Sequence, residues 1–96
     1  MSKKQRDQLI TARPLVAWIV SCPGYDDSVT IAQTSSRAKG NIFAFARDKS
    51  IPINWNGLRV RRAKQYDRLA SQFLPRQCII TKHADQMLQA QQELPI

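Results

Sequence analysis

Residues 34–68 read TSSRAKGNIFAFARDKSIPINWNGLRVRRAKQYDR, and this stretch decides how we interpret the fold. It holds nine basic residues and two acidic ones, Asp48 and Asp67, so it carries a net charge of +7 out of the +8 of the whole chain. The apolar spacing of its first half is typical of a helix, and the alternation near its end is typical of a strand. We therefore predict a helix that leads into a strand, with a positive surface on one side.

The helix is predicted over Ser36–Lys49. Ser35 or Ser36 is a good N-cap, because a serine hydroxyl accepts one of the unpaired amides of the first turn. The helix should end before Ile51, since a residue that precedes proline is pushed out of the helical region.

One face of this helix is apolar and consists of Ala38, Ile42, Phe43, Phe45 and Ala46. We expect Ile42 and Phe45 to pack on a sheet. Arg37 and Arg47 fall on the opposite face and should point outward.

Three further segments have the patterns of strands. Leu15–Cys22 is apolar on both alternating faces and suits a central strand, and Ser28–Gln33 alternates. The turn formers of Pro23–Asp27 lie between them, so the two segments predict a β-hairpin. Downstream, Leu58–Arg61 alternates: the two apolar side chains should face inward, while Arg59 and Arg61 point outward together.

The C-terminal third is expected to add helices. Residues at helical spacing predict a second amphipathic helix that Pro75 stops, formed by Tyr66, Leu69, Ala70, Phe73 and Leu74. Gln77–Lys82 is a candidate for a short last strand, and Ala84–Gln92 has a weak helical stripe.

Together these elements predict an α+β fold, a small single domain over residues 14–96 with a ββαβ core and one or two additional C-terminal helices. Residues 1–13 form a basic N-terminal arm, which we interpret as a mobile terminus more readily than as a phosphate-tracking segment. The 96 residues suffice for one core. No apolar run approaches the ~20 residues that cross a bilayer.

Catalytic and metal-binding residues are sparse. The only histidine, His83, has Asp85 two positions away, and on a helix such side chains diverge. Cys22 and Cys78 belong to no CxxC pair, so we expect two free thiols and no structural metal, with a disulfide as the alternative. We predict a protein that is not an enzyme and needs no cofactor.

The positive residues are the best candidates for a site. Guanidinium groups bind phosphate oxygens bidentately, so several on one rigid surface would form a patch that follows a phosphate backbone. The candidate residues are Arg37, Arg47, Arg59, Arg61, Arg62 and Lys64. The alternative is a solvated charged edge that discourages sheet-to-sheet aggregation. Trp55 is either a lid on the core, which we favour, or an exposed stacking ring.

Two segments resemble phage proteins. Thr34-Ser35-Ser36-Arg37-Ala38-Lys39 and the stretch Leu58–Asp67 are similar to small uncharacterised bacteriophage and prophage proteins, which implies a mobile-element origin and a cytoplasmic location in a bacterial host. Ala46–Pro52 followed by Gly57–Arg62 is similar to the recognition-helix end and wing of phage excisionases. In that family a separate first helix comes before this segment, whereas here the strand-like Val29–Gln33 takes its place.

Two functions follow from these observations. The first is a non-enzymatic, phage-type binder of nucleic acid or of a nucleoprotein complex, with no small-molecule substrate. The second is a phage inhibitor that docks on a host protein, such as an antidefence or anti-CRISPR protein. An exposed Trp55 or Tyr66 beside the arginines would favour the second, because such rings anchor protein interfaces.

Overall fold

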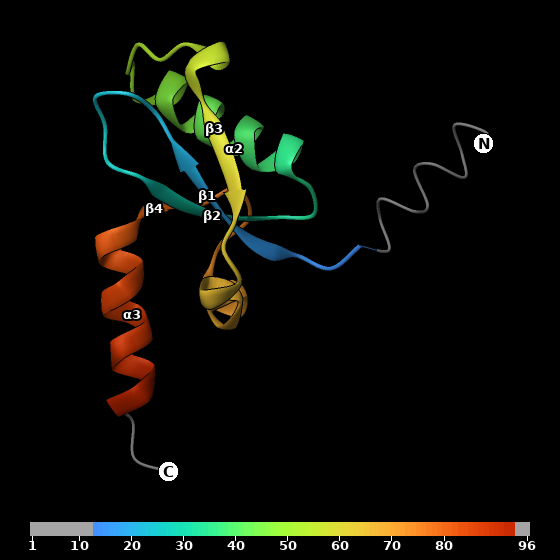
Figure 1. The fold of residues 1–96 in the computed structure, drawn as a ribbon, viewed down its shortest axis with the longest axis vertical. Coiled ribbons are helices and arrows are strands. Elements are labelled where there is room, and N and C mark those ends of the chain that lie inside the picture. The colour runs from blue at the N-terminus through green and yellow to red at the C-terminus, as the bar shows by residue number, and fades with distance from the viewer. Residues whose placement is uncertain (1–12, 94–96) are drawn as a thin grey trace, which may run out of the picture.

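A four-stranded antiparallel sheet forms the centre of the protein (Figure 1). The computed structural model describes residues 13–93; the basic arm predicted over residues 1–13 lies outside this range except for Arg13. The strands are β1 (Val16–Ser21), β2 (Ser28–Ala32), β3 (Arg59–Arg62) and β4 (Cys78–Ile80), in the order β3-β1-β2-β4. The prediction of an α+β fold is confirmed.

The predicted hairpin occupies the middle of the sheet. β1 pairs with β2 so that Ile19 lies opposite Val29. The turn between them begins with a hydrogen bond from the Tyr25 amide to the Cys22 carbonyl at 3.1 Å. Gly24 has φ of 86°, a left-handed conformation that glycine adopts without steric cost. The turn residues and the alternation of the two strands thus both favour the hairpin that the structure contains.

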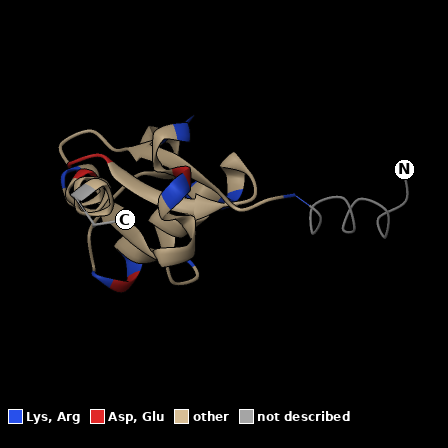
Figure 2. Cartoon of the chain, turned by 90° about the horizontal axis from the view of Figure 1, so that it is seen from below, with Lys and Arg blue, Asp and Glu red and all other residues tan. Residues whose placement is uncertain are grey.

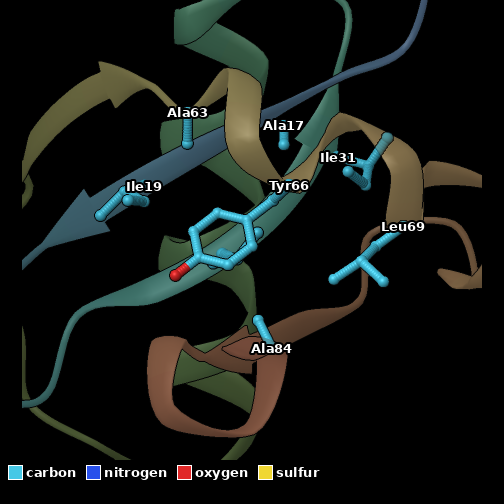
Figure 3. Close-up of a cluster of buried hydrophobic side chains, with 8 residues drawn as sticks. Ala17, Ile19, Ile31, Ala63, Tyr66, Leu69 and Ala84 are labelled. Carbon is cyan, nitrogen blue, oxygen red and sulfur yellow. The ribbon is translucent and has the colours of Figure 1, made fainter. Parts of the chain in front are cut away.

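Helical segments cover both faces of the sheet. The helix α2 (Ser35–Asp48) packs on the face that contains Val20 and Ala32. The 3₁₀ helix η2 (Lys64–Gln72) and the helix α3 (Thr81–Glu93) pack on the other face. Figure 3 shows Tyr66 and Leu69 of η2 together with Ala17, Ile19 and Ile31 of the sheet in this second cluster. A central strand with helices on each side explains why β1 is apolar at successive positions.

The start of α2 differs from the prediction by one residue. Thr34, with φ of −139° and ψ of 160°, is the N-cap, and its Oγ1 accepts the Arg37 amide at 3.2 Å. Ser35 and Ser36 are therefore inside the helix, because Thr34 is the last residue with the extended backbone that a cap requires.

The helix packs through a narrow strip. Ala38, Ile42 and Ala46 are buried, whereas the side chain of Phe45 is 40% exposed. The prediction for Ile42 is confirmed and that for Phe45 is wrong. Two small alanines let the helix backbone approach the sheet closely, which leaves Phe45 on the flank, with the Lys49 ammonium 6.0 Å from its ring centroid.

The second predicted helix is helical but of the 3₁₀ type. Tyr66 and Leu69 are buried, and three-residue spacing places them on one side of a helix with three residues per turn. The bond from the Tyr66 amide to the Ala63 carbonyl at 3.0 Å has the same short spacing. The element ends at Gln72, so Leu74, predicted to lie in the apolar stripe, is 71% exposed.

The last two elements follow the prediction. β4 lies within the predicted segment Gln77–Lys82, and α3 contains the predicted segment Ala84–Gln92. Cys22 and Cys78 are free thiols, and burial raises the pKa of the Cys78 thiol to about 11. No helix within residues 13–93 is both long enough and apolar enough to cross a membrane.

Candidate functional site

The six predicted site residues do not converge on one surface. Arg59 and Arg61 lie opposite Ser21 and Ile19 of β1, so they project on the face of the sheet that η2 and α3 cover. The helix α2, which carries Arg37 and Arg47, packs on the opposite face. Figure 2 shows lysines and arginines on several sides of the domain. The single positive surface expected from the sequence is therefore divided by the sheet.

Arg62 takes part in the fold. Its two Nη atoms donate to the two carboxylate oxygens of Asp67, at 2.7 and 2.5 Å. The Ala17 amide donates to the same Asp67 Oδ1 at 2.8 Å, and Arg62 Nη1 donates to the Ala17 carbonyl at 2.9 Å. The hydrogen bonds from Arg62 hold the pKa of Asp67 below its ordinary value, with a further contribution from the Ala17 amide. This clamp joins β1, β3 and η2, and phosphate would have to compete with Asp67 for the guanidinium.

Arg59 and Arg61 are exposed, as predicted, and Leu58 is buried beneath the strand. Arg61 lies 3.5 Å from an oxygen of Asp27, which weakens its field. Arg59 Nη1 instead donates to the Asn56 carbonyl at 3.0 Å, and this bond keeps the guanidinium at the turn that precedes β3. Lys64 is exposed at the start of η2, where its charge acts on Asp67.

An aromatic and basic surface surrounds the short 3₁₀ turn η1 (Trp55–Gly57). We call it the Trp55 surface, and it consists of Trp55 of η1, the two α2 side chains that contact its ring, Lys39 and Phe43, and Arg47, which follows them on the same side of α2. The Lys39 ammonium lies 4.5 Å from the centroid of the Trp55 ring. The Phe43 ring meets Trp55 edge-on, with centroids 5.4 Å apart and planes at 80°. Lys39, Phe43 and Arg47 are spaced four residues apart, so they form one stripe along the helix.

Trp55 is not the core lid that the sequence favoured. Its side chain is 41% exposed, because the neighbouring Ile53 and Leu58 pack into the core under α2 and Trp55 rests on Phe43 outside them. The Asn54 side chain caps the turn by accepting the Asn56 amide at 3.0 Å. A Cβ at Gly57 would lie 3.8 Å from Pro23, which places η1 beside the turn of the central hairpin. The ring is thus held in place while remaining accessible to solvent.

A cleft of about 660 Å³ lies elsewhere, between the exposed side of α2 and the loop after η2. The α2 wall contains Arg37 and Gly40, and the loop wall contains Leu74, Pro75 and Arg76. Arg37, the sixth predicted site residue, thus belongs to this cleft, where its Nη1 donates to Gln33 Oε1 at 2.9 Å. Sequence reasoning missed the cleft because its two walls are about 35 residues apart in the chain.

The remaining candidates for chemistry lie on and under α3. His83 and Asp85 are both exposed. Asp85 accepts a hydrogen bond from the Tyr66 hydroxyl, and burial together with this bond raises the pKa of Tyr66 to about 12. Among residues 13–93, no group of three or more histidine, cysteine or acidic side chains is placed to hold a metal ion.

No family model matches the chain, and neither a curated protein nor a solved structure matches it.

Proposed function

We propose that the protein binds nucleic acid through the Trp55 surface and that it prefers strands with unpaired bases. The observation that carries the proposal is the exposed Trp55 ring with the Lys39 ammonium 4.5 Å from its centroid. Proteins that bind single strands combine aromatic rings, on which bases stack, with cations that accompany the phosphates. In a duplex the faces of each base are covered by the neighbouring bases. An exposed tryptophan ring can therefore stack on an unpaired base more readily than on a paired one.

The cations at this surface suit that role. Lys39 and Arg47 extend from one stripe of α2, with Lys39 at the Trp55 ring and Arg47 about two turns further along the helix. The two ion pairs among the described residues join Arg61 to Asp27 and Arg62 to Asp67, so Lys39 and Arg47 have no described carboxylate within 4.0 Å. About two phosphate contacts would give a slope near −1.4 for log K against log salt on a single strand.

The test compares a fluorescein-labelled single-stranded oligothymidine with a duplex of the same length. We expect tighter binding of the single strand, a weakening of about fivefold to a hundredfold for Trp55→Ala, and a flatter salt dependence for Arg47→Ala. Lys82→Ala on α3 is the matched control, because it removes an exposed cation outside the Trp55 surface. Equal affinity of wild type and Trp55→Ala for the oligonucleotide would refute the proposal.

An exposed tryptophan also supports the second candidate, docking on a host protein, since such rings anchor protein interfaces. A pull-down from a nuclease-treated bacterial lysate separates the two. A protein that stays bound to wild type and is lost with Trp55→Ala favours docking, whereas loss of every partner on nuclease treatment favours nucleic acid.

A further inference from the structure

The cleft between α2 and the loop after η2 has the features of a binding site distinct from the Trp55 surface. Its floor and rims are largely apolar, and two large side chains at its border are exposed to solvent: Leu15 at 61% and Leu74 at 71%. Gly40 and Ala44 lie one helical turn apart on the α2 wall. A Cβ at Gly40 would have no atom within 4 Å, so the missing side chain leaves open space there.

The walls of the cleft are fixed by hydrogen bonds. Thr30, which is fully buried in β2, donates from Oγ1 to the Gln77 carbonyl at 2.9 Å and accepts from Asn41 Nδ2 at 3.0 Å. Gln77 closes the loop, because its amide donates to the Leu74 carbonyl at 3.0 Å and its Oε1 accepts the Leu74 amide at 2.9 Å. The α2 wall and the loop wall are thus tied to the same strand, which keeps the cleft open at a set width.

The charge of the cleft is positive. Arg37 and Arg76 stand on its two walls, and none of the described residues that line it is acidic. The ion pairs within residues 13–93 involve other arginines, so no described carboxylate neutralises these two. An anionic group in the cleft would meet two guanidinium groups that are positioned to bind carboxylates.

Arg76 also has an unfavourable backbone. Its φ is 64°, in the left-handed region, at the position after Pro75 in a tight turn where glycine or asparagine is usual. Such a conformation is strained for a non-glycine residue and occurs preferentially at functional sites. Glycine would be less strained in this turn but would remove the guanidinium from the cleft.

From these observations we infer that the cleft binds an extended segment of a partner protein in which apolar side chains alternate with carboxylates. Leucine-sized side chains would pack against Phe73 and Ala70 on the floor, while carboxylates would bind Arg37 and Arg76 at the mouth. Along an extended chain successive side chains point to opposite sides, so an alternating sequence can make both contacts at once. The outer edge of β2 beyond Thr30 borders the cleft, since β4 pairs only with Ser28–Thr30.

The probes are three fluorescein-labelled hexapeptides: ELELEL, its uncharged counterpart QLQLQL, and ESESES, which lacks the apolar side chains. Fluorescence polarisation with the full chain measures binding. We expect ELELEL to bind with one-to-one stoichiometry and at least about tenfold more tightly than either of the others, because each of those loses one of the two kinds of contact.

Two variants connect this binding to the cleft without depending on a weakened fold. Arg76→Gly removes the guanidinium and relieves the left-handed strain, so it should lower ELELEL affinity about tenfold with an unchanged or higher melting temperature. Gly40→Leu fills the open space on α2 with a better helix former, so it should abolish peptide binding in a protein that is at least as stable. Lys82→Gln is the control for loss of an exposed cation outside the cleft.

The following outcomes would overturn the inference. Absence of ELELEL binding, equal binding of all three peptides, or full binding by Arg76→Gly and Gly40→Leu would do so. A dimer that Gly40→Leu dissociates would assign the cleft to a second copy of the chain. Loss of oligothymidine binding on Arg76→Gly would assign it to nucleic acid. Trp55→Ala should leave ELELEL binding unchanged, so the peptide site and the Trp55 surface can fail independently.

Discussion

The Asp67 carboxylate accepts the backbone amide of Ala17 at 2.8 Å, across 50 positions of sequence. Asp67 thereby supplies a hydrogen bond to β1 just beyond the last residue of β3 in the sheet, and Arg62 holds it there. Three elements therefore depend on one charged side chain.

The first prediction concerns Asp67→Asn. The substitution removes the charge that pairs with Arg62, and we expect it to lower the free energy of unfolding by about 1–2 kcal/mol at neutral pH, a moderate figure because the Asp67 side chain is 37% exposed. Urea denaturation measures the change. Asp48→Asn, which alters an exposed carboxylate at the end of α2, is the control and should have little effect.

The same pair predicts an acid dependence. The folded pKa of Asp67 is lowered, so its contribution to stability is fully present above the unfolded pKa of about 4 and is lost as pH falls through the lower folded value. Urea midpoints measured from pH 6 downward should fall more steeply for wild type than for Asp67→Asn. Parallel curves for the two proteins would show that Asp67 ionisation is not linked to folding.

A second ionisation is linked to stability at alkaline pH. Burial and the bond to Asp85 raise the pKa of Tyr66 to about 12, so the folded state keeps its proton where the unfolded tyrosine, with a pKa near 10, has lost it. Stability from this group is present below pH 10 and is lost as pH rises toward 12. Phenolate absorbance measured during an alkaline titration checks this. The Tyr66→Phe variant should lack the ionisation near pH 12, and the control variant Tyr25→Phe should retain it.

The cap of α2 gives a prediction with an internal control. Thr34→Ala leaves the Arg37 amide without its side-chain acceptor and should lower the free energy of unfolding by about 1 kcal/mol. Ser36→Ala, one of the two caps expected from sequence, lies inside the helix and should be neutral or slightly stabilising. Thermal denaturation of the two variants distinguishes them, and the reverse order would move the cap to Ser36.

The next prediction concerns whether glycine at position 40 lowers the stability of α2 beside the cleft. Gly40→Ala should raise the free energy of unfolding by up to about 1 kcal/mol, because alanine is the better helix former and the added Cβ meets no atom within 4 Å. Urea denaturation provides the measurement. A loss of stability would mean that Gly40 has a structural role inside the domain.

Local patterns predicted the parts of this fold that depend on neighbouring residues. The hairpin follows from the alternation of its strands and the turn between them, and the outward direction of Arg59 and Arg61 follows from the two-residue period of β3. The position of α2 was predicted to within a residue because Pro52 and the polar residues before Arg37 limit it.

The predictions that were wrong concern contacts between segments that are far apart in the sequence or separated by a turn of the chain. Arg62 pairs with Asp67 because the chain turns from β3 into η2 and brings the two side chains together. In the sequence alone, the same residues have the pattern of an exposed basic run. Trp55 is partly exposed because Phe43 and Leu58 occupy the space that it was expected to cover. The spacing of Lys39, Phe43 and Arg47 was visible in the sequence, but the contacts of Lys39 and Phe43 with Trp55 depend on the tertiary structure.

The strand order carries a consequence for folding kinetics. The two central strands are joined by a six-residue turn, Cys22–Asp27, while both outer strands come from segments that follow α2. Closing a short loop costs less entropy than closing a long one, so the hairpin is the natural nucleus, onto which β3 and then β4 can add as edges. Substitutions at the Ile19–Val29 pair should accordingly slow refolding, whereas substitutions at Ile79 should chiefly speed unfolding.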